Sequence, residues 1–257
     1  MKIFVLLFIT CFMGCSCKEN KTTKQSSAFN KTQKVLPVLK NDNQPITNTF
    51  VLGKFNYKQD NTFIKEDSKF TNKTIYLQKE VYKSFLRMQS AALIEGVTLK
   101  IISGTRNFYE QKAIWERKWK THHKLSPKQR ALKILEYSSM PSTSRHHWGT
   151  DLDLNSLNNS YFNTRKGLTE YNWLLANAND YGFYQVYTEK NNGRTGYNLE
   201  KWHWSYLPLA SQYLRYYNAH ITLDDISEFS GSEMAKELNV ITTYVNGISK
   251  HAKANNN

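Results

Sequence analysis

Two short stretches in which side-chain type alternates strictly constrain the fold most strongly. Residues 150–154 read Thr-Asp-Leu-Asp-Leu, and residues 201–206 read Lys-Trp-His-Trp-Ser-Tyr. Because successive side chains of a β-strand point to opposite faces, each stretch predicts a strand with one apolar and one polar face. The leucine and aromatic faces belong in a core. Asp153 and His203 are therefore expected on the opposite, open face.

The surrounding sequence predicts helices interspersed with short strands. Apolar residues recur at helical spacing in several segments, and glycines such as Gly96 and Gly182 follow two of them as stop signals. We predict helices over residues 78–95, 108–120, 126–137, 169–181, 208–219 and 232–245, and further strands over 97–102 and 183–187. Helices packed on a small antiparallel sheet make an α+β fold.

The N-terminal residues resemble an export signal. A lysine precedes a short apolar run at residues 3–9, which is too short to span a bilayer. All three cysteines follow, and Cys17 or Cys15 lies in a context that resembles a bacterial lipoprotein processing site. A lipidated cysteine would anchor the exported protein to a membrane surface of the cell envelope, in the periplasm or at the cell surface. Ordinary secretory cleavage without a lipid is the alternative.

The composition divides the chain into four segments. Residues 1–17 form the export or lipoprotein signal, and residues 18–48, rich in Lys, Asn, Thr, Gln and Ser, form a disordered tether. The main folded domain is expected over residues 49–220. Residues 221–257 are expected to hold a C-terminal helix and a frayed tail.

The net charge of +14 is compatible with nucleic acid, an anionic membrane or an anionic wall polymer as partner. The lysines are scattered and form no dense basic block, which favours a soluble lysine-rich surface and no nucleic-acid partner. No cysteine follows Cys17. A metal ion in the folded domain must therefore be held by nitrogen and oxygen.

The two alternating stretches, with the residues just before each, contain the residue types of a catalytic zinc site. His146, Asp153 and His203 supply two imidazoles and one carboxylate, and catalytic zinc sites use three such ligands and leave one position open for water. His146 lies just before its strand and can fold back over Asp153. Glu200, three residues before His203, can reach the open position as a general base. His147 is either a group that supports a ligand or unrelated to the site.

These residues resemble the signature of D-alanyl-D-alanine carboxypeptidases of the vancomycin-resistance type, within the LAS metallopeptidases. The family pattern Ser-x-His-x-x-Gly-x-x-x-Asp, followed by Glu-x-Trp-His, is met by Ser144, His146, Gly149, Asp153, Glu200, Trp202 and His203. An upstream Ser-Gly-x-Arg with a following glutamine is met by Ser103, Gly104, Arg106 and Gln111. Further landmarks are Tyr181, Gly182, Phe183, Gly196 and Tyr197, so the likeness spans residues 79–206.

The resemblance implies a zinc peptidase domain that acts on peptidoglycan stem peptides. It implies that His146, Asp153 and His203 bind zinc and that Glu200 activates water. Arg106 would stabilise the oxyanion or hold the substrate, because a guanidinium stays charged and offers a fork of donors. Ser144, Gln111 and Lys201 are candidates for substrate contacts, although Ser144 fits a turn residue equally well.

The chain departs from the family pattern at positions that bear on substrate choice. The family usually has a small residue at Asp151, proline at Lys201, and arginine at Val186 and Ser205. Asp151 either orients a ligand histidine or is simply solvated. The segment 121–140 resembles an insertion that could form a wall of the cleft.

We therefore predict an exported, lipid-anchored zinc D,D-carboxypeptidase that removes the terminal D-Ala of stem peptides. An L,D-carboxypeptidase or an endopeptidase with the same zinc chemistry is the first alternative. The missing arginines weaken the exopeptidase case, since a free terminal carboxylate needs a cationic partner. A non-catalytic wall-binding module is the second alternative, and the retention of Glu200 beside three candidate ligands argues against it.

Overall fold

The computed structural model describes residues 45–66, 69–191 and 193–254. The predicted export signal, both candidate lipidation cysteines and nearly all of the predicted tether lie outside these residues. Across the ranges just given, no helix is both long and apolar enough to cross a bilayer.

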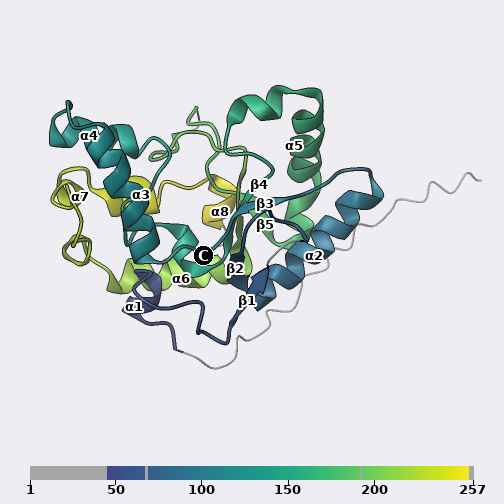
Figure 1. Ribbon diagram of the computed structural model, residues 1–257, viewed down its shortest axis with the longest axis horizontal. Coiled ribbons are helices and arrows are strands. Elements are labelled where there is room, and N and C mark those ends of the chain that lie inside the picture. Colours follow the sequence, from purple (N-terminus) through teal and green to yellow (C-terminus); the bar gives the residue numbers. More distant parts are fainter. Residues whose placement is uncertain (1–44, 67–68, 192, 255–257) are drawn as a thin grey trace, which may run out of the picture. The chain divides into compact units, whose positions relative to one another are not determined.

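A four-stranded antiparallel sheet lies at the centre of the fold. Its spatial order is β3 (Ile101–Ser103), β4 (Asp151–Leu154), β6 (His203–Tyr206) and β5 (Phe183–Gln185). In the view of Figure 1, the labelled strands of this sheet lie between helices α2 and α5 on one side and α3 and α4 on the other. A second antiparallel pair joins β1 (Phe63–Glu66) to β2 (Ile75–Gln78). The predicted α+β class is confirmed.

The register of the two central strands brings their polar residues together. Asp153 lies opposite His203, and Asp151 lies opposite Ser205. The intervening Leu152 is fully buried in the hydrophobic core, as the alternation predicts. Both faces of these strands are buried, however, so the polar face lies in a recessed site rather than on an exposed surface.

The helices of the described residues are α1 (Asn48–Val51), α2 (Lys79–Ile94), α3 (Phe108–Thr121), α4 (Pro127–Ile134), α5 (Arg165–Asn177), α6 (Leu207–His220), α7 (Met234–Glu237) and α8 (Lys250–Ala254). Helices α2 to α6 follow the predicted segments with shifted ends, whereas α1 and α8 fall outside every predicted helix. Capping boxes at Asn107 and Ser126 start α3 and α4, because each side chain accepts a hydrogen bond from the backbone three residues on. Helix α5 begins at Arg165 rather than 169, since Thr164 caps it.

The C-terminal segment differs most from expectation. The helix predicted over 232–245 is interrupted, because Asn239 adopts a φ of 46° between α7 and a π-helical turn at Ile241–Val245. Residues predicted to fray form α8, in which Ala252 is buried. Core residues continue past position 220 and include Ile226, Phe229, Val240, Tyr244 and Ile248. The segment therefore packs as part of the main domain.

Candidate metal and catalytic site

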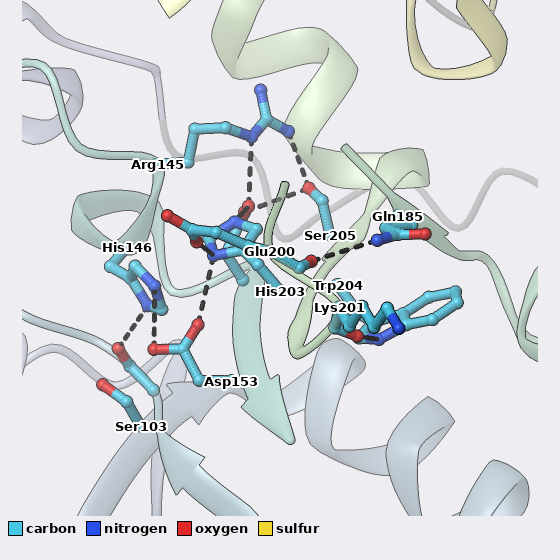
Figure 2. A network of polar contacts seen from close by, with 12 residues as sticks. Ser103, Arg145, His146, Asp153, Gln185, Glu200, Lys201, His203, Trp204 and Ser205 are labelled. Carbon is cyan, nitrogen blue, oxygen red and sulfur yellow. Dashed lines mark hydrogen bonds and ion pairs between the residues drawn. The ribbon is translucent and has the colours of Figure 1, made fainter. Parts of the chain in front are cut away.

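The three predicted ligands converge from three elements. Asp153 comes from β4, His203 from β6, and His146 from the 3₁₀ turn Arg145–Trp148 that precedes β4. Gly149 ends this turn with a φ of 69°, and a Cβ there would lie 2.4 Å from the Phe63 ring. Glycine is therefore required for the chain to turn from His146 into the strand. Figure 2 shows His146 and His203 on either side of Asp153.

The distances and chemistry of these groups fit a zinc ion. His146 Nε2 lies 3.4 Å from Asp153 Oδ2, and His203 Nδ1 lies 3.1 Å from Asp153 Oδ1. One ligand atom from each residue lies within 4.8 Å of the other two, and all three side chains are buried. Zinc ligands at tetrahedral angles and ordinary bond lengths are separated by about 3.4 Å. The donor set of two nitrogens and one oxygen is also one that catalytic zinc uses.

Each histidine has its second ring nitrogen engaged on the side away from Asp153. His146 Nδ1 donates to the backbone carbonyl of Gly104 at 2.8 Å. His203 Nε2 lies 2.9 Å from Asp151 Oδ1. Burial disfavours the charged form of His203, but hydrogen bonds to Asp151 and Asp153 outweigh it and raise its pKa to about 9. A positive charge is thus favoured at the position of the His203 ring, between the carboxylates of Asp151 and Asp153.

Asp151 is fully buried behind His203. The guanidinium of Arg145, itself buried, donates from Nε to Asp151 Oδ1 at 3.0 Å. Burial opposes ionisation of Asp151, yet Arg145 and His203 hold its pKa below the usual range. Of the two interpretations left by the sequence, a solvated Asp151 is therefore wrong.

Glu200 lies beside the ligands without belonging to them. Its Oε2 is 3.7 Å from His203 Nδ1, and the side chain lines the same cavity. The backbone of Glu200 is fixed by hydrogen bonds to Tyr187 and from Gln185. Burial raises the pKa of Glu200 to about 8, although His203 acts in the opposite direction. A carboxyl group with a pKa near neutrality suits proton transfer.

Arg106 reaches the site from the loop between β3 and α3. Its Nη1 lies 3.8 Å from Asp153 Oδ2 and also donates to the hydroxyl of Ser103. Gln111 accepts from Arg106 Nε at 3.1 Å and donates to the Ser139 carbonyl at 2.8 Å. Gln111 therefore orients Arg106, while its substrate contact stays a prediction.

A cavity of about 570 Å³ opens over these groups. Arg106, Gln111, Ser144, His146, Asp153, Glu200 and His203 all line it, together with residues 137–139 of the predicted insertion. The hydroxyl of Ser144 is buried and has no hydrogen-bond partner among the described residues, so it is available to a ligand. Tyr187 packs against the His203 ring at 4.6 Å between centroids and forms another part of the lining.

Helix α3 places two more cations on the cavity wall, which the sequence prediction missed. Arg117 and Lys118 line the cavity, and Lys118 Nζ donates to the Ser138 hydroxyl at 2.5 Å. No ion pair joins either cation to a carboxylate within the part of the chain that the structure describes. Burial, reinforced by Arg117, lowers the pKa of Lys118. Helical spacing could have predicted the position of Lys118, because Gln111, Ile114 and Lys118 share one face of the predicted helix.

Lys201 lies outside the cavity lining. Its Nζ donates to Asn163 Oδ1 at 3.1 Å and lies 5.2 Å from the centroid of the Tyr171 ring. A substrate contact by Lys201 stays a prediction that this geometry does not support.

His147 supports the site instead of facing it. Its Nδ1 donates to the Arg106 carbonyl at 2.7 Å, and its Nε2 accepts from the Ser142 backbone at 3.1 Å. Burial lowers the pKa of His147 to about 3. The neutral ring therefore joins the loop that carries Arg106 to the loop that carries His146.

Known proteins resemble this chain in sequence. A family model described as VanY, D-alanyl-D-alanine carboxypeptidase, matches residues 74–209. YodJ of Bacillus subtilis, named as an inferred carboxypeptidase, is 31% identical over 134 residues, which are 51% of this chain and 46% of YodJ. A D-alanyl-D-alanine carboxypeptidase of Enterococcus faecium is 30% identical over 136 residues, which are 52% and 39% of the two chains. The chain thus matches less than half the length of either relative.

Solved structures also resemble the chain. VanYB in complex with D-alanine-D-alanine is 22% identical, with a TM-score of 0.48, over 65% of this chain and 88% of that chain. The LD-carboxypeptidase LdcB is 22% identical, with a TM-score of 0.48, over 66% and 77% of the two chains.

Proposed function

Because the chain belongs to the VanY family of D-alanyl-D-alanine carboxypeptidases, we propose that it is a zinc-dependent D,D-carboxypeptidase of peptidoglycan stem peptides. The observation that carries the proposal is the convergence of His146, Asp153 and His203, with Glu200 beside them in one cavity. The same convergence argues against a non-catalytic wall-binding module. Such a module would have no need of a buried carboxyl group next to three ligand atoms.

The residues of the site divide the chemistry among them. His146, Asp153 and His203 would hold zinc, which when bound supplies Lewis acidity toward water and toward a carbonyl oxygen. Glu200 accepts the proton of the attacking water and returns it to the leaving amine. Arg106 donates to the carbonyl oxygen as negative charge develops there.

The charge of the cavity favours an exopeptidase over an endopeptidase. A substrate with a free C-terminus brings a carboxylate into the cleft, which needs cations and hydrogen-bond donors. Arg117 and Lys118 of α3 and Arg106 of the preceding loop supply three cations to the lining, and Ser144 supplies an unengaged hydroxyl. These groups compensate for the arginines that the family pattern has at positions 186 and 205.

We also propose that the protein is exported and lipid-anchored through Cys17 or Cys15. This part rests on the N-terminal sequence alone. Fractionation of cells that express the wild type or the Cys17→Ser and Cys15→Ser variants tests it. The anchored form is expected in the membrane fraction, and the variant that lacks the lipidated cysteine is not.

The decisive experiment is a digest of purified muropeptides, with and without a chelator, followed by mass spectrometry. Pentapeptide stems that lose one alanine support the proposal, provided that a chelator stops the reaction and zinc restores it. Tetrapeptide stems that shorten to tripeptides identify an L,D-carboxypeptidase. Cross-linked dimers that fall to monomers identify an endopeptidase. No product with added zinc overturns the enzymatic assignment.

A further inference from the structure

We infer that Asp151 is a positioning residue for the metal site, which fixes the ring of His203 so that Nδ1 faces the metal. The inference rests on the proposed function only in taking His146, Asp153 and His203 as metal ligands. It concerns a position at which the chain departs from the family pattern, and it assigns that departure a role.

The strand register places Asp151 behind the ligand. Asp151 and Asp153 lie on the same face of β4, two residues apart, and His203 of β6 lies between their carboxylates. Its Nδ1 is 3.1 Å from Asp153 Oδ1, whereas its Nε2 is 2.9 Å from Asp151 Oδ1. Because Nε2 is held at Asp151 Oδ1, Nδ1 lies on the side of the ring that faces Asp153, where it can bind a metal ion.

The carboxylate of Asp151 cannot easily turn, because both oxygens are occupied. Oδ1 accepts from His203 Nε2 and from Arg145 Nε at 3.0 Å. Oδ2 accepts from Thr150 Oγ1 at 2.6 Å and from Ser205 Oγ at 3.0 Å. A second ring orientation of His203 would leave a buried charge with one hydrogen bond fewer, which is costly.

Arg145 holds the Asp151 carboxylate in place by direct contact, from Nε to Oδ1 at 3.0 Å. It donates from Nη2 to Ser205 Oγ at 2.6 Å, and its guanidinium lies over the Trp148 ring at 4.9 Å. Arg145 immediately precedes the predicted ligand His146. One short turn therefore supplies both a ligand and the cation that holds Asp151, the hydrogen-bond partner of His203. Figure 2 shows Arg145 and Ser205 on the side of His203 away from Asp153.

Two of the four departures from the family pattern are in direct contact. Asp151 and Ser205 are cross-strand partners and are hydrogen-bonded to each other. Arg145 donates to both. The three side chains therefore form one network, in which the carboxylate of Asp151 orients His203.

The first test measures zinc affinity of the Asp151→Asn variant by competition with a chromophoric chelator. Asn keeps the shape but removes the charge, and its amide can donate to Nε2 and place the proton on Nδ1. Zinc binding is expected to weaken about 10- to 100-fold, the usual effect of removing a partner that orients a ligand. Ser205→Ala is the graded comparison, because it removes one donor to the same carboxylate and leaves the contact between Asp151 and His203 in place. It should weaken zinc binding less than Asp151→Asn does.

The second test does not depend on the folding of a variant. In zinc-loaded wild type labelled with ¹⁵N-histidine, long-range ¹H–¹⁵N correlations are expected to show His203 protonated at Nε2 and metal-bound at Nδ1. A proton on Nδ1, or zinc affinity of a folded Asp151→Asn variant equal to that of the wild type, overturns the inference and leaves the proposed function intact. Wild type that binds no zinc overturns both.

Discussion

The two walls of the cavity hold their polar groups in different ways. On the sheet wall, His203 and Asp153 are buried, and each makes polar contacts with buried side chains. On the helix wall, Arg117 and Lys118 of α3 are cations without a carboxylate partner among the described residues. Buried and fully paired groups keep one geometry, whereas cations without a counter-charge are available to a ligand.

The two walls of the cavity are therefore suited to different tasks. A reaction needs its groups held to within a fraction of an ångström, and the sheet provides this through strand register. Recognition of a carboxylate needs accessible positive charge, which the helix provides. Arg106 lies between the two walls, since it contacts Asp153 yet its side chain is 23% exposed. Changes on the sheet wall should lower kcat, and changes on the helix wall should raise KM.

The largest effect on catalysis is expected from Glu200→Gln. The amide cannot take up a proton, so kcat on a D-Ala-terminated peptide should fall about 10²- to 10⁴-fold. Zinc stoichiometry and thermal stability should stay close to those of the wild type, because Gln has the same shape and Glu200 is not a predicted ligand. Steady-state kinetics, metal analysis and thermal unfolding measure these three quantities. Full activity in this variant would show that another group is the base.

Arg106→Met should have the next largest effect. Removal of a donor to a developing oxyanion costs about 10²- to 10³-fold in kcat. Arg106→Lys serves as the control, because it keeps the charge but loses the fork of donors that contacts Ser103 and Gln111. Its kcat should fall between that of the wild type and that of the methionine variant. Equal kcat in all three proteins would show that Arg106 takes no part in the reaction and only stabilises the conformation of its loop.

The sheet wall could be predicted from the sequence because its pattern is local. Two-residue alternation fixes which side chains share a face, so it predicts that Asp153 and His203 both lie on the polar face. The partners of Asp151 could not be predicted in the same way. Arg145 and Ser205 meet it only through strand pairing and the folding back of a short turn, which no spacing in the chain encodes.

The remaining differences between prediction and structure also have local causes. The face of α3 that carries Gln111 also carries Lys118, so this cation could have been found from helical spacing. The interruption of the helix predicted over 232–245 depends on a single positive φ at Asn239, which periodicity does not reveal. Lys201 was grouped with His203 by alternation, but β6 begins only at His203, so the alternation does not extend to it.

Lys118→Met tests the recognition role of the helix wall. Loss of one charge-assisted hydrogen bond to a substrate carboxylate is worth about 1.5–3 kcal/mol, so KM should rise roughly tenfold or more while kcat changes little. Lys120→Met is the matched control, because Lys120 lies on the same helix, is exposed, and does not line the cavity. It removes the same charge and should leave KM unchanged. An equal rise in KM for both variants would point to long-range attraction instead of a binding contact.

The smallest effect is expected from Lys201→Ala, where the alternation of the sequence and the observed geometry disagree. Alternation places Lys201 on the face of His203 and predicts a weaker substrate contact after its loss. The structure instead places its ammonium on Asn163 and over the Tyr171 ring. We therefore expect kcat and KM within about twofold of the wild type, with a loss of stability of about 0.5–1 kcal/mol from the cation–π contact. Thermal unfolding and kinetics on one preparation measure both. A tenfold rise in KM would extend the binding surface past the cavity to Lys201 and weaken the contrast between the two walls.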